Sequence, residues 1–159
     1  MNTIVGGGLL IGILCAFWTF VMGFTGWYKN PAMMPAFFVV ILIQLVVILR
    51  GLKQTAAQGR TYGGQVAAGT LMSLVAGLIV IGSSLLFTMV AFPEYFAELR
   101  VVQAEMLKAD GKTEAQIAAE LEMASQTQTP VMQALFGFIG TMVTGVVGSL
   151  IIGAFYRKK

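Results

Sequence analysis

Residues 131–155 have the sequence VMQALFGFIGTMVTGVVGSLIIGAF, in which no side chain is ionisable. A helix of about 20 apolar residues crosses roughly 30 Å of hydrocarbon, so this stretch is long enough to span a membrane. Three similar stretches precede it, at about residues 4–26, 33–49 and 64–91, and the second is the shortest. We therefore expect an all-α integral membrane protein with four transmembrane helices packed as a bundle.

The composition also indicates a membrane protein. Of the 159 residues, 57% are apolar and only 11% are charged, whereas soluble domains have roughly half and a quarter. This length suits a single membrane domain, residues 1–159, without a separate catalytic domain. The net charge is +3, but the basic residues lie beside apolar stretches rather than along one polar face, so we expect the lipid bilayer, and no nucleic acid, as a partner.

The basic residues also predict the orientation. Arg50, Lys53 and Arg60 lie between the second and third stretches, and residues 157–159 (RKK) follow the fourth. Lys and Arg concentrate in cytoplasmic loops, so both termini are expected in the cytoplasm. Residues 93–130, which hold all seven acidic side chains, then face the periplasm or the exterior.

The acidic segment has the pattern of two helices. Pro93 can open the first helix, and Gly111 can end it. Thr113 with Gln116 matches a capping box, which begins a second helix. We expect an extramembrane amphipathic helical hairpin over about residues 93–129, between the third and fourth spans. Its carboxylates are interpreted as a solvated face rather than a cation site.

Small residues recur every four positions in three of the spans. Positions four apart share one helix face, and small residues there let two helix backbones approach closely. We expect these faces to serve packing inside the bundle, with a dedicated dimer contact as the alternative. The helix-packing residues predicted in this way are Gly8, Gly12, Ala16, Gly69, Ser73, Gly77, Gly137, Gly145 and Gly153.

Gln44 is the one polar residue that we single out inside a span. It lies in an otherwise aliphatic stretch, where an amide without a hydrogen-bond partner is costly. We expect it to contact a hydroxyl of a neighbouring helix or subunit, and a role in binding a ligand is the alternative.

The sequence contains no pattern typical of catalysis. It has no histidine, which is the commonest metal ligand and general base. Phosphate-binding glycine loops and nucleophile motifs are also missing. No Asp, Glu, Lys or Arg lies in any span, although ion-coupled carriers usually place one there. We therefore predict no catalytic, cofactor or metal site, and a protein that is not an enzyme.

Several short motifs carry a resemblance to a known family. They are Gly63 and Gly64 after the basic loop, PEYF at residues 93–96, GKTEAQI at 111–117, EMA at 122–124, Pro130, and GSLII at 148–152 before the basic tail. Together they resemble the bacterial membrane proteins of domain-of-unknown-function family 4199 (DUF4199). The resemblance implies a four-helix protein of the bacterial inner (cytoplasmic) membrane, and it implies neither an activity nor catalytic residues.

Two main functions remain open, and direct binding of a lipid or pigment between the helices is a third possibility. In the favoured one, the protein is a non-catalytic accessory or scaffold subunit that binds another membrane protein, or another copy of itself, in a larger complex. The alternative is a carrier or pore for an uncharged or lipid-like solute that passes along Ser and Thr side chains inside the bundle.

Overall fold

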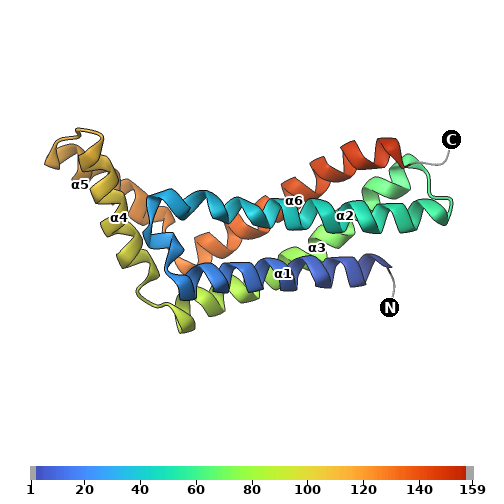
Figure 1. Cartoon of the computed structure of the whole chain (residues 1–159), viewed down its shortest axis with the longest axis horizontal. Helices are drawn as coiled ribbons and strands as arrows, with labels where there is room; N and C mark the ends of the chain where they lie inside the picture. Colours follow the sequence, from blue (N-terminus) through green and yellow to red (C-terminus); the bar gives the residue numbers. More distant parts are fainter. Residues whose placement is uncertain (1–2, 157–159) are drawn as a thin grey trace.

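The computed structural model describes residues 3–156, and this part of the chain is helical without any strand. Four long helical segments are apolar enough to cross a membrane. They lie alongside one another, and two shorter helices extend from one end of the molecule (Figure 1). The predictions of an all-helical chain and of four apolar spans are confirmed.

The four long helices are α1 (Thr3–Thr25), α2 (Val39–Ala57), α3 (Tyr62–Leu86) and α6 (Pro130–Phe155). The two shorter helices are α4 (Tyr95–Ala109) and α5 (Glu114–Thr127). Three further segments have a different helical pitch: the 3₁₀ helices η1 (Trp27–Lys29) and η2 (Pro31–Phe38), and the π-helical turn η3 (Phe87–Ala91). The basic tail at residues 157–159, which we used to predict the orientation, lies outside the described residues.

The second apolar segment is longer than predicted. It extends over Pro31–Ala57, 27 residues, whereas residues 33–49 were expected. Arg50 and the residues after it are compatible with a helix, and no proline follows to interrupt it. The chain leaves the helical conformation only near Gly59, whose φ of +76° is the left-handed conformation that glycine adopts easily. At its other end, η2 is held against α1 by Trp18, whose indole Nε1 donates to the Ala36 carbonyl at 2.9 Å.

The transition from α3 to α4 is controlled by Pro93. The last turn of α3 widens into η3, where the Phe92 amide donates to the Phe87 carbonyl at 2.8 Å. Phe92 itself has φ −136° and ψ 67°, because a residue before proline is driven out of the α-helical region. Pro93 therefore precedes α4 rather than opening it, and α4 begins at Tyr95.

The other helix boundaries follow the sequence signals. Gly111 has φ +79° after α4, and the Thr113–Gln116 capping box is present at the start of α5. The Thr129 side chain accepts a hydrogen bond from the Met132 amide, with Pro130 in the first turn of α6. These boundaries were predicted correctly because helix caps depend on a few neighbouring residues.

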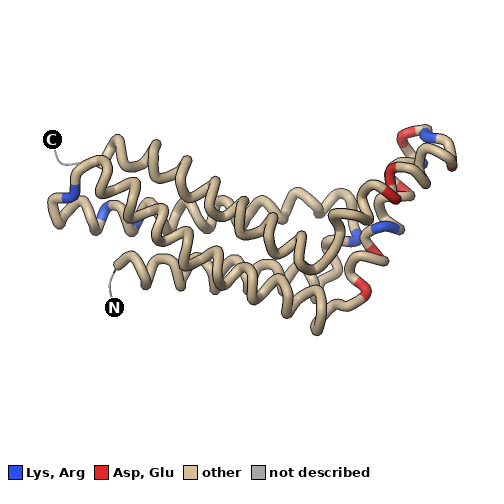
Figure 2. The backbone as a smooth tube through the Cα atoms, turned by 180° about the vertical axis from the view of Figure 1, so that it is seen from behind, with Lys and Arg blue, Asp and Glu red and all other residues tan. Residues whose placement is uncertain are grey.

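The core lies where α1, α2 and α3 meet. Ile11, Ile48, Leu52 and Met72 are completely buried there. Helices α2 and α3 each contact the other three long helices, and the most extensive contacts are those of α3 with α6 and α1. The two ends of the molecule differ in charge: every acidic residue lies at the end that carries α4 and α5, as Figure 2 shows. The α2–α3 connection, with Arg60, lies at the opposite end.

Candidate functional site

Helices α3 and α6 meet through two reciprocal pairs of glycine and serine. A Cβ atom added at Gly69 would collide with the Ser149 side chain, and one at Gly145 would collide with Ser73. Both serines are completely buried. Each hydroxyl donates to the carbonyl of the glycine one turn earlier on its own helix, at 3.0 Å for Ser73 and 2.5 Å for Ser149. The serines thus fill the space that the glycines leave, and this face is occupied within the chain.

The remaining predicted glycines also face neighbouring helices of the same chain. Added Cβ atoms at Gly8 and Gly12 would overlap Val75 and Ile79 of α3. Ala16 is half-buried on α1. The other pairs join α3 and α6: Gly77 with Phe138, Gly137 with Val80, and Gly153 with Gln65. Within the apolar helices, Gly63, Gly82 and Gly140 instead have no atom within 4 Å of an added Cβ, so these three glycines face outward.

Gln44 connects three helices. Its Nε2 donates to the Thr141 carbonyl of α6 at 2.6 Å and to Ser73 Oγ of α3 at 3.2 Å. Only 4% of its surface is exposed. An added Cβ at Gly145 would lie 3.2 Å from this nitrogen, so the glycine also leaves room for the amide. The partners of Gln44 thus belong to its own chain and include the Ser73 hydroxyl.

A second buried glutamine was missed by the sequence analysis. Gln65 is completely buried at the other end of α3. Its Nε2 donates to the carbonyls of Tyr156 at 2.9 Å and Leu52 at 3.3 Å, and its Oε1 accepts from Thr55 Oγ1 at 2.6 Å. Its amide thereby donates to the Tyr156 carbonyl, which lies just past the end of α6, where no further backbone N–H of the helix is available as a donor. Its position near a span end, where polar residues are common, gave no signal of this role.

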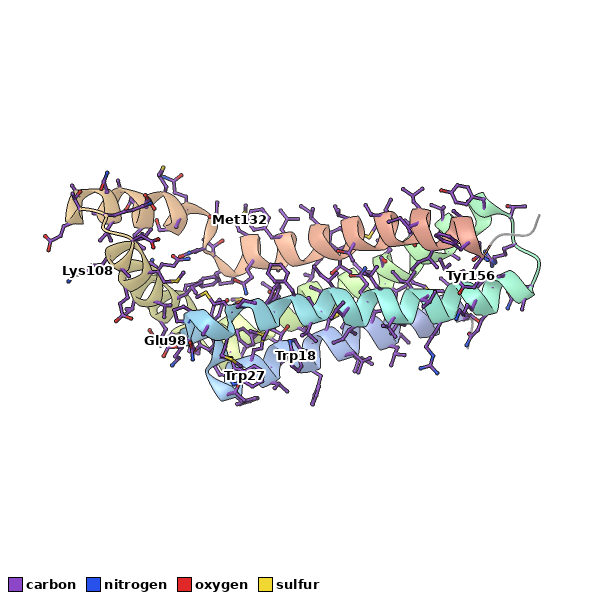
Figure 3. The ribbon with its side chains drawn as sticks, turned by 45° about the horizontal axis from the view of Figure 1, so that its top comes forward. Trp18, Trp27, Glu98, Lys108, Met132 and Tyr156 are labelled. Carbon is purple, nitrogen blue, oxygen red and sulfur yellow. The ribbon has the colours of Figure 1, made fainter. Side chains whose placement is uncertain are left out.

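Helix α4 is attached to the η1 segment by a three-residue contact. The Tyr28 hydroxyl donates to Glu98 Oε2, and Lys29 Nζ lies 2.6 Å from Glu98 Oε1. Figure 3 shows Glu98 where α4 meets the long helices, near Trp27 and far from Tyr156. Tyr28 also packs against Tyr95 of α4, with ring centroids 4.9 Å apart. We call Tyr28, Lys29 and Glu98 the α4 anchor.

The α4 anchor shifts the pKa values of Glu98 and Tyr28. The hydrogen bonds from Lys29 and Tyr28 hold the pKa of the Glu98 carboxyl below its usual value, because both favour the ionised form. Burial raises the pKa of Tyr28 because it disfavours the charged phenolate, and the adjacent Glu98 carboxylate raises it further because it repels that phenolate. At neutral pH, Glu98 is therefore the acceptor and Tyr28 the donor.

Most carboxylates beyond the α4 anchor have no basic partner. In the described range, ion pairs form only between Glu98 and Lys29 and between Glu120 and Lys112. The other five acids are exposed and unpaired; they are Glu94, Glu105, Asp110, Glu114 and Glu122. No set of three His, Cys, Asp or Glu side chains among residues 3–156 is placed to hold a metal ion. The acidic end is thus an array of separate carboxylates.

An open groove of about 360 Å³ runs between α4 and α5. Its apolar walls are Ala104, Ile117, Ala118 and Leu121, and its charged members are Glu105, Lys108 and Glu114. No residue of α5 is buried, so this helix keeps its apolar side chains accessible. We call this region the α4–α5 groove. Apolar walls with charged edges are the arrangement found at protein-binding surfaces.

Comparison with known proteins supports a family and nothing further. The family model described as "Protein of unknown function (DUF4199)" matches residues 7–158. No curated protein and no solved structure matches the chain.

Proposed function

The chain belongs to the DUF4199 family of proteins of unknown function, and we propose that it is a non-catalytic accessory or scaffold subunit of a larger membrane complex. In this proposal, α1, α2, α3 and α6 form a transmembrane four-helix bundle in the bacterial inner membrane. Helices α4 and α5 form an extramembrane hairpin that binds a partner protein. The observation that carries the proposal is the α4–α5 groove, which is apolar, edged by charge and open.

The attachment of α4 supports this role. A surface that is already ordered loses less conformational entropy when a partner binds. The α4 anchor and the buried Phe96 and Val102 hold α4, while α5 has no buried residue. The partner that fits has an apolar side chain for the groove and basic residues for Glu105 and Glu114. Opposite charges would guide it to this end of the molecule.

The charge distribution supports the proposed orientation. Arg50, Lys53 and Arg60 lie around the end of α2 and the connection to α3, far from the acidic helices. Short loops rich in Lys and Arg remain cytoplasmic. The α4–α5 groove would then face the periplasm, and its partner is another membrane protein of the same complex or a periplasmic protein attached to it.

The packing of the long helices favours a scaffold over a carrier. Ser73 and Ser149 occupy the space beside Gly145 and Gly69, and the amide of Gln44 is bonded to its own chain. A solute that moved along this line would have to separate α3 from α6. The alternative, a carrier or pore for an uncharged or lipid-like solute, requires such a separation, and the second experiment below tests it.

The first experiment locates the partner by photo-crosslinking in native membranes. A photoreactive amino acid at Ala118, in the groove, is expected to give one discrete adduct with a partner protein. The same probe at Leu42, an exposed position on α2, should not give that adduct. The double variant Glu105→Gln/Glu114→Gln should reduce the adduct several-fold, because the partner's basic residues lose their acceptors.

A matched variant removes the same charge elsewhere. Glu94→Gln/Asp110→Asn also neutralises two exposed carboxylates, neither of which lines the groove. If this pair reduces the adduct as much as Glu105→Gln/Glu114→Gln does, the groove is not the docking site. If Ala118 and Leu42 give the same adducts, α5 has no specific partner.

The second experiment tests the carrier alternative. The purified chain is reconstituted into vesicles, and the entry of uncharged solutes such as glycerol is compared with that into empty vesicles. We expect no difference, either for the wild type or for Gln44→Leu. Solute entry that requires the wild-type chain and disappears in Gln44→Leu would refute the scaffold proposal.

A further inference from the structure

A second groove lies at the end of the molecule opposite α4 and α5. It is open, has a volume of about 430 Å³ and runs between α1 and α2. Binding sites for small molecules have roughly 300–1,000 Å³. Residues of α1 in its wall are Thr3, Gly6, Gly7 and Leu10, and those of α2 are Val47, Arg50, Gly51 and Gln54. We call it the α1–α2 groove.

Glycines make this groove possible. A Cβ atom added at Gly7 would lie 3.0 Å from the Met72 sulfur, and one at Gly51 would lie 2.5 Å from the Met72 methyl carbon. The completely buried Met72 side chain of α3 therefore fills the space beside these two glycines and lets α1 and α2 pack against it. Leu10, Val47 and the glycines supply the apolar part of the groove wall, which suits a hydrocarbon chain. The polar part of the wall comes from Thr3, Arg50 and Gln54.

Arg50 gives the α1–α2 groove one strong positive charge. Its side chain is exposed in the groove wall, and the two ion pairs of the described chain do not involve it. The acids all lie at the far end of the molecule (Figure 2). Lys53 is directed elsewhere, with Nζ 5.3 Å from the centre of the Tyr156 ring. The N-terminal end of α1, at Thr3, adds partial positive charge to the same rim. Among the described residues no carboxylate pairs with Arg50, so its guanidinium is available to an anionic ligand.

We propose that the α1–α2 groove binds one anionic phospholipid, with an acyl chain along α1 and α2 and the phosphate group at Arg50. The guanidinium can donate two parallel hydrogen bonds to phosphate oxygens. Basic pockets between transmembrane helices bind anionic headgroups on the cytoplasmic side, which is where the proposed orientation places Arg50. Free phosphate would leave the apolar walls without a ligand. In a zwitterionic lipid the headgroup's own cation balances the phosphate charge, so its phosphate would pair less strongly with Arg50.

Native mass spectrometry of the full-length chain in neutral detergent tests this inference. The protein is titrated separately with dioleoylphosphatidylglycerol, dioleoylphosphatidylcholine and glycerol phosphate. We expect a single bound phosphatidylglycerol at about tenfold lower concentration than phosphatidylcholine, a difference of about 1.4 kcal/mol, because its net negative charge favours pairing with Arg50. Glycerol phosphate, which has the headgroup without acyl chains, should neither bind detectably nor compete.

Three variants separate the site from general charge effects. Arg50→Gln should abolish the preference for phosphatidylglycerol, and Arg50→Lys should restore part of it. Gly6→Leu narrows the groove and should weaken both lipids. The matched control is Arg60→Gln, which removes the same charge from the α2–α3 connection outside the groove. Helix content and melting temperature are measured for each variant to confirm folding.

The inference is overturned by any of three results. Equal binding of the two lipids by the wild type would show that Arg50 does not select charge. An equal loss with Arg60→Gln and Arg50→Gln would show that only net charge matters. Strong competition by glycerol phosphate would identify a soluble phosphate compound as the ligand. None of these results bears on the α4–α5 groove, so this inference and the docking proposal can fail separately.

Discussion

At the residue scale, the placement of serine opposite glycine controls the distance between α3 and α6. Gly69 faces Ser149 and Ser73 faces Gly145, so each pair combines a missing side chain with a small one. Because both hydroxyls are bonded within their own helices, they bring no unsatisfied polar group into the contact. The contact depends on shape more than on hydrogen bonding between helices, which makes it sensitive to added volume.

Gly145→Leu is therefore expected to destabilise the protein strongly. The new side chain would occupy the positions of Ser73 and the Gln44 amide, and overpacking of this kind costs about 1–3 kcal/mol. Gly140→Leu is the matched control, because Gly140 lies on the same helix with open space around it. Thermal unfolding in detergent should show a lower melting temperature for Gly145→Leu only. Equal effects of the two variants would mean that helix α6 is not packed as described.

At the element scale, α4 depends on the α4 anchor for its attachment to the long helices. Glu98 accepts from both Tyr28 and Lys29, and these bonds hold its pKa below the usual value. The Glu98 pKa is lower in the folded chain than in the unfolded chain, so at pH values above the unfolded-state pKa the ionised carboxylate stabilises the attachment. This stabilisation is lost as the pH falls through the folded-state pKa of Glu98. The anchor is thus complete at neutral pH and weakens in acid.

Lys29→Met should move this transition to higher pH. Without the ammonium group, the Glu98 carboxyl loses the largest cause of its lowered pKa, so it should titrate closer to its usual value. A carboxyl-carbon NMR titration measures the pKa, and amide exchange in α4 reports the attachment. Lys112→Met is the control, because Lys112 pairs with Glu120 instead. An unchanged Glu98 titration in Lys29→Met would contradict the ion pair.

At the scale of the whole molecule, the separation of charge sets up two different ends. One end carries all seven acids and the α4–α5 groove, and the other carries Arg50 and the α1–α2 groove. In a membrane the two ends would meet different surroundings, because cytoplasmic leaflets are rich in anionic lipid. The proposed partner and the proposed lipid would then bind on opposite sides.

This arrangement predicts a sided labelling pattern. Single cysteines are placed at Gln58, after α2, and at Lys112, between α4 and α5, in a Cys15→Ala background. A membrane-impermeant maleimide added to intact spheroplasts should label Lys112→Cys at once, whereas Gln58→Cys should react only after the membrane is opened. Cys15 is buried and would react poorly with the reagent, and its replacement by alanine, which removes one sulfur atom, excludes any remaining background labelling. The reverse pattern would invert the proposed orientation.

Individual residues show how far the sequence could predict this structure. The caps at Thr113 and Thr129 were predictable, because a cap involves residues only a few positions apart. Gln44 was recognised as needing a partner, but Ser73 and Thr141 could not be named as its partners. Gln65 went unnoticed, because its burial depends on the end of α6, 91 residues away in sequence.

The sequence by itself determined the four apolar segments, the two acidic helices between the third and the fourth, and the concentration of carboxylates there. Hydropathy is a sum over neighbouring residues, and a helix cap is a contact between residues a few positions apart. Both can therefore be recognised in the sequence. Only the tertiary structure decided that Gly145 faces Ser73, that Glu98 reaches Tyr28 and Lys29, and that Arg50 stands at an apolar groove. Such contacts depend on how each helix is rotated and shifted against its neighbours, and the packing of all the helices together sets those two quantities.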